Sequence, residues 1–191
     1  MLGHKYRKQV KEGPGLAATG ELRIVAESPD GMVRVEMTPT TGIRLAFHPD
    51  TAEHHTERTV EPQIEMALFR AVADGARSPG SVAERESAGN RAGRIGVTPW
   101  HGAVADRIEN LAVRATSPRR HIAVEWTGHD ELTVVLSANV LHRLPLDGVA
   151  EEINTTLRDL TYRRSVAIRK ITQDCRRRFE RDAAPRPCPV R

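Results

Sequence analysis

The same order of short segments occurs twice along this chain of 191 residues. In each half, three short apolar runs, most of them alternating with polar residues, have the character of half-buried strands. The runs cover residues 22–27, 32–37 and 43–47, and then 122–126, 132–136 and a short run ending at 144–146. A shift of 100 residues places Ile24 on Val124 and Met32 on Leu132. Because a repeated unit constrains a fold strongly, we predict an α+β fold of two tandem units, each a three-stranded antiparallel meander packed with helices.

Turn and helix signals complete each unit. Residues 28–31 and 38–42 join the first three runs with residues suited to hairpin turns. A helix is predicted from about Val60, with Thr59 as its N-cap. Another is predicted to begin after Thr98, with an apolar face formed by Val104, Ile108, Leu111, Ala112 and Ala115. The last helix is predicted to start at Asp147 and, if unbroken to Arg181, to span on the order of 50 Å.

Composition divides the chain into five parts. Residues 78–97 are rich in Gly, Ser and isolated charges, lack apolar periodicity, and are predicted to form a flexible linker. This linker separates a first α+β unit at 19–77 from a second at 98–182. Residues 1–18 form a basic N-terminal arm, and residues 183–191 form a tail that we predict to be disordered.

Charge is unevenly distributed along the chain. The formal net charge is +4, from 29 Lys and Arg against 25 Asp and Glu. Residues 1–12 carry +3 and residues 162–181 carry +6, whereas residues 13–161 carry −6. Basic ends around an acidic middle are typical of a protein with a polyanionic partner, and two solvated termini are the alternative interpretation.

The last helix carries the most informative pattern. At about 100° per residue, an apolar stripe lies along one side, formed by Val149, Ile153, Leu157, Leu160, Ala167, Ile171 and Cys175. Arg164 and Arg178 project along this stripe, so the packing there must open or pair them with acids.

Two sets of basic residues lie outside the stripe. One face is shared by Arg163, Lys170, Arg177 and Arg181, and a smaller second row is formed by Arg169 and Arg176. Such a surface could follow a phosphate backbone without specifying a base sequence. Lys5, Arg7 and Lys8 in the N-terminal arm carry the same sign. The alternative is that these arginines only complement the helix dipole.

Residues 28–37 (SPDGMVRVEM) and 42–49 (GIRLAFHP) resemble the meander of the YbaB/EbfC nucleoid-associated proteins, especially their actinobacterial relatives. The resemblance covers roughly residues 20–77, and the second half agrees in the order of elements but has Asp130 and Glu131 in place of the Asp-Gly turn. It implies a small, non-enzymatic DNA-binding protein that dimerises through its sheet and helices, so a tandem chain could form an internal pseudo-dimer. Some actinobacterial relatives are associated with type VII secretion.

Catalytic motifs do not occur in the sequence. It contains no Gly-x-Ser-x-Gly, phosphate loop, Cys-x2-Cys or His-Glu-x2-His. The one metal-like cluster is His48, Glu53, His54 and His55, in which adjacent histidines point in different directions. We therefore predict no enzyme activity, no cofactor and no metal. No apolar run is long enough to cross a bilayer, which argues against a membrane partner, and two cysteines fit a reducing, cytoplasmic setting.

The sequence thus predicts a cytoplasmic, nucleoid-associated or accessory regulatory protein that binds DNA or RNA through the phosphate backbone, as a homodimer or an internal pseudo-dimer. The alternative is a protein-interaction or chaperone-like accessory factor of a type VII secretion system, with a protein partner. Under that alternative, charge reversal at Arg163, Lys170 and Arg177 leaves partner binding intact. Polar substitution of Leu157 or Ile171 would abolish it.

Overall fold

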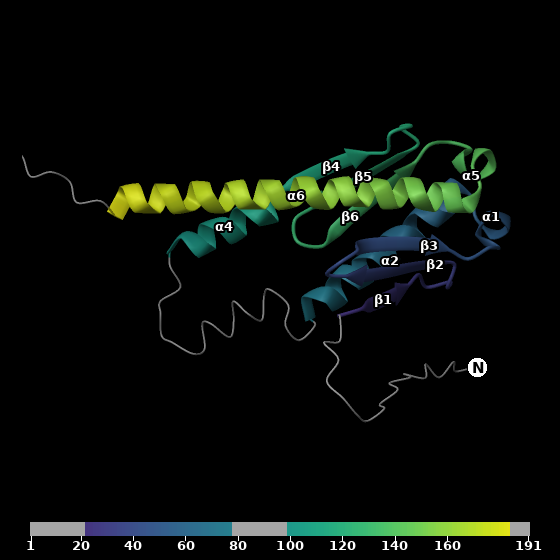
Figure 1. The fold of residues 1–191 in the computed structure, drawn as a ribbon, viewed down its shortest axis with the longest axis horizontal. Coiled ribbons are helices and arrows are strands. Elements are labelled where there is room, and N and C mark those ends of the chain that lie inside the picture. The colour runs from purple at the N-terminus through teal and green to yellow at the C-terminus, as the bar shows by residue number, and fades with distance from the viewer. Residues whose placement is uncertain (1–21, 78–98, 184–191) are drawn as a thin grey trace, which may run out of the picture.

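Two three-stranded antiparallel sheets and their helices make up the computed structural model, which describes residues 22–77 and 99–183 (Figure 1). The first unit contains β1 (Ile24–Glu27), β2 (Val33–Thr38), β3 (Gly42–Phe47), α1 (Thr51–His54) and α2 (Glu57–Arg77). The second contains α4 (Pro99–Glu109), β4 (Ala112–Thr116), β5 (Ile122–Thr127), β6 (Glu131–Leu136), α5 (Val140–Arg143) and α6 (Leu146–Ala183). The predicted α+β class, with two meanders and a long C-terminal helix, is confirmed. The predicted arm at 1–18 and linker at 78–97 lie outside the described residues.

The two units repeat at a separation of 89 residues, because Val33–Thr38 of β2 corresponds to Ile122–Thr127 of β5 (122 − 33 = 89). The same separation relates β3 to β6 and α1 to α5. The predicted shift of 100 residues is therefore wrong.

The error comes from residues Ala112–Thr116, which form the first strand of the second unit. Their helical spacing led to the prediction that they continue the preceding helix. That helix ends at Glu109, where the Asn110 side chain donates to the Asp106 carbonyl. The predicted strand at 144–146 does not form. Leu144 has extended dihedral angles but only ends α5, and α6 begins two residues later.

Equivalent turns join the first two strands of each unit. The Ser28 hydroxyl accepts from the Val33 N–H at 2.9 Å, and the Ser117 hydroxyl accepts from the Ile122 N–H at 3.2 Å. Both serines precede a proline, and the left-handed position is filled by Gly31 in one turn and by Arg120 in the other. These side-chain bonds fix the register of each hairpin.

Helix α2 begins at Glu57, earlier than the predicted start near Val60. Thr59 is therefore inside the first turn and is not the N-cap. Its hydroxyl instead accepts from the Thr56 N–H at 2.9 Å. Helix α6 runs unbroken for 38 residues, about 57 Å.

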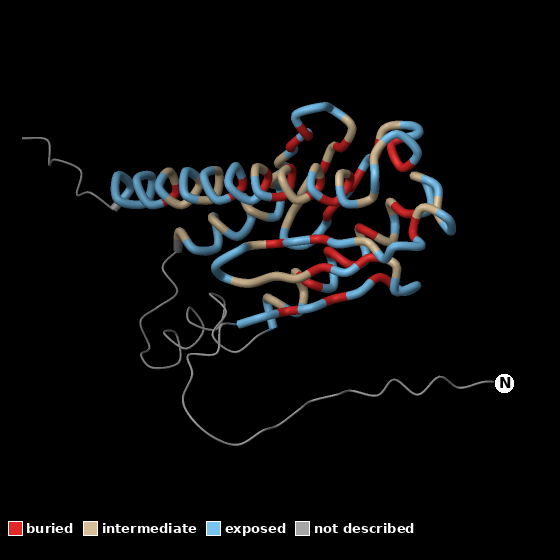
Figure 2. The backbone as a smooth tube through the Cα atoms, turned by 45° about the vertical axis from the view of Figure 1, so that its right-hand side comes forward, coloured by how far each residue is buried: buried red, intermediate tan, exposed pale blue. Residues whose placement is uncertain are grey.

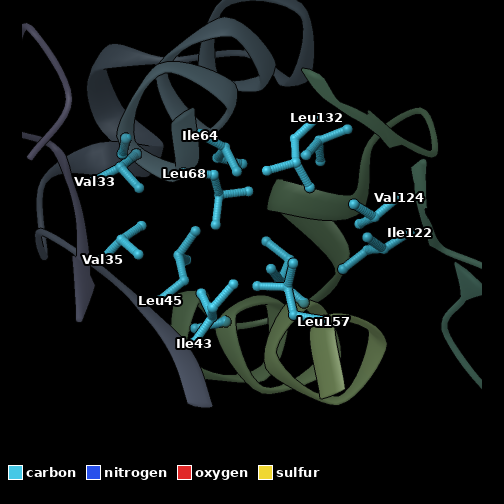
Figure 3. Packing of buried hydrophobic residues seen from close by; sticks show 14 of the residues in the cluster. Val33, Val35, Ile43, Leu45, Ile64, Leu68, Ile122, Val124, Leu132 and Leu157 are labelled. Atoms are coloured by element: carbon cyan, nitrogen blue, oxygen red, sulfur yellow. The ribbon is translucent and has the colours of Figure 1, made fainter. Parts of the chain in front are cut away.

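Each long helix packs against both sheets. Helix α2 contacts β1 and β2 of its own sheet and β6 of the other, whereas α6 contacts β4, β5 and β3. The inward side chains of the two sheets and two helices meet in one hydrophobic core (Figure 3). Helix positions 89 residues apart carry the same kind of buried residue, as in the pairs Val60 and Val149, Ile64 and Ile153, and Leu68 and Leu157. The two units therefore share a single core.

Helix side chains also cover the edges of the sheets. The Asn154 side chain accepts from the Leu45 N–H at 2.6 Å and donates to the Leu45 carbonyl at 2.9 Å on the edge of β3. On the edge of β6, Glu65 and Glu61 accept from the N–H groups of Val134 and Leu136. Occupied edge groups are protected from pairing with another strand.

Candidate nucleic-acid interface

The C-terminal part of α6 extends past both sheets, and α4 lies alongside it (Figure 1). Helix α2 ends at Arg77, which corresponds to Val166 in the second unit, so residues 167–183 have no helical counterpart in the described first unit. We call residues 167–183 the α6 extension. Figure 2 shows that most of this segment is exposed. Cys175, on the side of the apolar stripe, is buried.

Six basic side chains of the α6 extension are exposed to solvent: Arg169, Lys170, Arg176, Arg177, Arg178 and Arg181. Its acids are Asp174, Glu180 and Asp182. At 100° per residue, Lys170, Arg177 and Arg181 fall within about 40° of one another and form the first basic row. Arg169 and Arg176 form the second basic row, about 100° further round the helix.

Most of these cations have no acidic partner among the residues that the structure describes. Arg176 pairs with Glu180 at 2.7 Å. Across the described ranges 22–77 and 99–183, no carboxylate lies within ion-pairing distance of the other five. Arg169 and Arg181 use one guanidinium nitrogen, Nε, to donate to the carbonyls of Ser165 and Arg177. Both side chains are exposed, and the six basic residues outnumber Asp174, Glu180 and Asp182, so the α6 extension carries a net positive charge.

Arg163 differs from the other predicted residues because it belongs to the body of the protein. It forms an ion pair with Asp159 at 2.8 Å, and its Nη1 donates to the Arg114 carbonyl on β4 at 3.4 Å. Arg70 of α2 makes a similar bond to the Glu27 carbonyl on β1. Arg163 therefore holds a strand edge and is already paired with an acid.

Arg164 is buried. The sequence predicted that the packing around Arg164 would open or that an acid would pair with it, and neither arrangement is observed. Its guanidinium lies over the Trp126 ring, 4.4 Å from the ring centroid, and donates to the Gly128 carbonyl. No acid pairs with it within the described part of the chain, and burial lowers the pKa of its guanidinium. The corresponding residue of the first unit is Gly75, where an added Cβ would lie 2.2 Å from the end of Met37, the counterpart of Trp126. Arg178, in contrast, is exposed.

The outer face of the first sheet also carries arginines, and acids pair with two of them. Arg23 and Glu36 make a two-point contact at 2.7 Å, and this hydrogen-bonded pairing lowers the pKa of Glu36. Arg34 lies 3.9 Å from Glu27. Arg44 on β3 is exposed on the same face without an ion pair to the described residues, so this face keeps three arginines against two glutamates.

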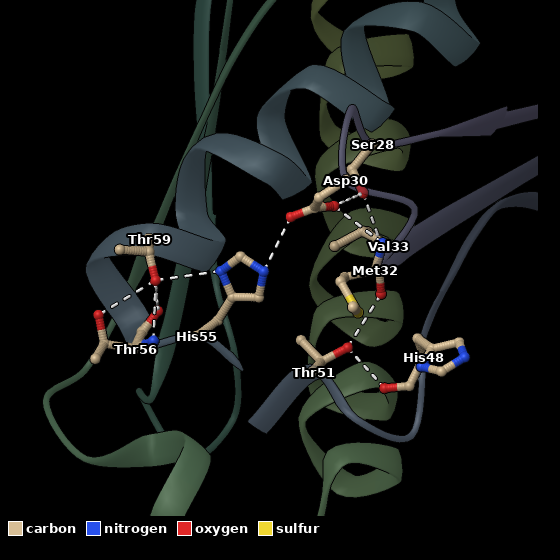
Figure 4. Close-up of polar contacts among 9 residues, drawn as sticks. All are labelled: Ser28, Asp30, Met32, Val33, His48, Thr51, His55, Thr56 and Thr59. Atoms are coloured by element: carbon tan, nitrogen blue, oxygen red, sulfur yellow. Dashed lines mark hydrogen bonds and ion pairs between the residues drawn. The ribbon is translucent and has the colours of Figure 1, made fainter. Parts of the chain in front are cut away.

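The predicted histidine cluster is dispersed. His55 Nε2 lies 2.9 Å from Asp30 Oδ2, and its Nδ1 lies 3.2 Å from the Thr59 hydroxyl (Figure 4). His48 instead contacts Asp50. Among the described residues, no group of three or more His, Cys, Asp or Glu side chains is placed to hold a metal ion.

Asp30 is the centre of this polar network. Burial acts to raise the pKa of its carboxyl, but hydrogen bonds from the Ser28 hydroxyl and the Met32 N–H, together with His55, outweigh that effect and lower it. The network ties the β1–β2 turn to the start of α2 (Figure 4). The contact between Asp30 and His55 could not be predicted from the sequence, because it joins two loops.

Lys5, Arg7 and Lys8, the remaining predicted binding residues, lie outside the described residues. Within the described ranges, no helix has the length and apolar character needed to cross a membrane.

Fold and site together define a tandem α+β protein with one basic helical extension. Comparison with protein-family models, with curated proteins and with solved structures finds no match for this chain.

Proposed function

We propose that this chain is a non-enzymatic, cytoplasmic DNA-binding protein of the YbaB/EbfC type, acting as a nucleoid-associated or accessory regulatory factor. The observation that carries the proposal is the α6 extension, where Arg169, Lys170, Arg177, Arg178 and Arg181 are exposed without acidic partners in the described structure. The basic arm with Lys5, Arg7 and Lys8 would add to the same surface charge.

Contact with phosphates explains why such a surface needs no base-specific residue. Each neutralised phosphate releases counterions, so affinity falls with salt concentration. If the five unpaired side chains each neutralise one phosphate, log affinity against log salt has a slope of about −4.5. Contacts of this kind fix position on the duplex and leave sequence preference low.

A titration of labelled duplex DNA at several salt concentrations tests the proposal. The variant Lys170→Gln, Arg177→Gln, Arg181→Gln should bind more weakly, with a slope shallower by about 3. A matched control removes three exposed arginines outside α6, at Arg34, Arg44 and Arg58. This control variant should keep the slope of log affinity against log salt that the parent protein shows. Absence of binding by the parent at low salt, or equal losses in both triple variants, would refute the proposal.

A protein-interaction role in type VII secretion remains the second candidate, and exposed apolar side chains favour it. Met66 and Phe69 on α2 are each 43% exposed. Substituting both with Glu should then abolish partner binding and leave DNA binding unchanged. Leu157, considered earlier for this test, is only 1% exposed in the core, so a polar residue there would unfold the protein. Ile171 on α6 is only half-exposed, so Met66 and Phe69 are the clearer probes.

A further inference from the structure

We infer that the α6 extension enters the major groove of duplex DNA, with its two basic rows facing the opposite walls of the groove. This inference rests on the proposed DNA binding and adds the form of nucleic acid and the groove. It follows from three features of the helix: the angle between its rows, the side chains between them, and the open space around it.

The two rows are placed to reach two strands. On a helix about 10–12 Å across, side chains about 100° apart end roughly 10 Å from each other. The major groove of B-DNA is about 12 Å wide and admits an α-helix. Lys170 and Arg177 could therefore contact one strand while Arg169 and Arg176 contact the other. A single row would contact only one backbone.

The strip between the rows is largely uncharged. Gln173 lies on it between the two rows, and Tyr162 and Val166 continue its line on the preceding turns of α6, with exposures of 67% and 42%. Glu180, further along, is bonded to Arg176. An amide or an apolar side chain can approach base edges and the thymine methyl group. A helix face that contacts phosphates alone does not need amide or apolar side chains.

None of the described elements covers this face. Helix α4 lies along α6, and the buried Cys175 is on the side opposite the strip. The sheets end before the extension does (Figure 1). From Tyr162 to Arg181 the open face is about 28 Å long, enough to follow the groove past several base pairs.

Three duplexes of equal length and sequence test the inference by fluorescence anisotropy. The first is unmodified DNA, the second carries glucosylated 5-hydroxymethylcytosine, which fills the major groove, and the third is RNA. The RNA has the same phosphate charge, but its major groove is too narrow for side chains to read. Unmodified DNA should bind at least 10-fold more tightly than the other two. Equal affinity for all three would overturn the groove inference and leave phosphate binding standing. No binding to unmodified DNA would refute both this inference and the proposed function.

A matched pair of variants tests the strip itself. Gln173→Glu and Ser165→Glu add the same charge to exposed positions of α6, but only Gln173 lies on the strip. Gln173→Glu should weaken binding to unmodified DNA at least 5-fold more than Ser165→Glu, and the two variants should bind the glucosylated duplex equally. Equal losses on unmodified DNA, with helix content unchanged by circular dichroism, would overturn the inference.

Discussion

At the scale of residues, most polar side chains in the body of this protein hold backbone groups or other side chains in place. Asp30 accepts from Ser28 and Met32 and contacts His55, and Arg164 joins α6 to Trp126. Arg163 belongs to the same class, since Asp159 and the Arg114 carbonyl hold it. In the α6 extension, Arg176 alone of the six exposed basic residues pairs with an acid among the described residues.

The lowered pKa of Asp30 predicts a pH-dependent contribution to stability. Because the folded-state pKa lies below the ordinary value near 4, the contribution is present above about pH 4 and is lost as pH falls through the folded pKa. The gap in unfolding free energy between the parent and Asp30→Asn should therefore be larger at pH 7 than at pH 3. Urea titrations at both pH values measure it, and a gap independent of pH would contradict the assignment.

At the scale of elements, the helices complete the sheets by covering their edges. Asn154 occupies both backbone groups of Leu45, while Glu65, its counterpart 89 residues earlier, accepts from Val134. The Asn154 side chain therefore bonds backbone groups on the edge of β3 that a fourth strand would otherwise bond. The chemistry is not symmetric, because an amide both donates and accepts and a carboxylate only accepts.

Removing the Asn154 amide should leave the Leu45 N–H and carbonyl without their partner. Asn154→Ala is expected to lower the unfolding free energy by about 1–3 kcal/mol, and Asn154→Asp by less, since a carboxylate can still accept from the N–H. Thr155→Ala, on the next residue, should change it by less than about 0.5 kcal/mol. Denaturant unfolding of the three variants checks this. A loss of equal size at Thr155 would show that Asn154 has no special part in closing the edge.

Local pattern predicts elements well where one periodicity dominates. The alternating run in β2 and the turn at Ser28 and Pro29 are enough to place the first meander. Ala112–Thr116 was missed because its alanines continue the helical spacing of Val104 and Ile108, and pairing with β5 decides its conformation. The residues before and after Ala112–Thr116 in the sequence do not indicate that this strand pairs with β5.

In the candidate site, too, local features could be predicted from the sequence and contacts between distant elements could not. Exposure of Lys170 and Arg177 follows from the helical wheel. The pairing of Arg163 with Asp159 was also within reach, because residues four apart on a helix are neighbours. The contact between Arg164 and Trp126 was not, since it joins α6 to a sheet.

At the scale of the whole molecule, the two units are interlocked. Helix α2 completes the second sheet and α6 completes the first, and buried residues of both units form one core. Neither half can cover its inner sheet face alone. The stability of each unit therefore depends on the other, as in an obligate dimer.

Separate expression of residues 19–77 and 98–182 tests this dependence. Each fragment alone should unfold without a cooperative thermal transition, because its core face is exposed to water. An equimolar mixture should regain a single transition, measured by circular dichroism, with a midpoint that rises with concentration. Two fragments that each melt cooperatively, unchanged by mixing, would show two independent domains.

Among the described residues, α2 spans Glu57–Arg77 and α6 spans Leu146–Ala183, so the helix that we propose to enter the groove occurs once in this part of the chain. Through α6, one molecule would bind one stretch of duplex, and residues 22–77 and 99–183 contain no second such helix for another stretch. Bridging distant segments of a chromosome through this helix would thus require two molecules bound to each other. The compaction of the DNA should then rise with the square of the fraction of DNA sites occupied, instead of in proportion to it.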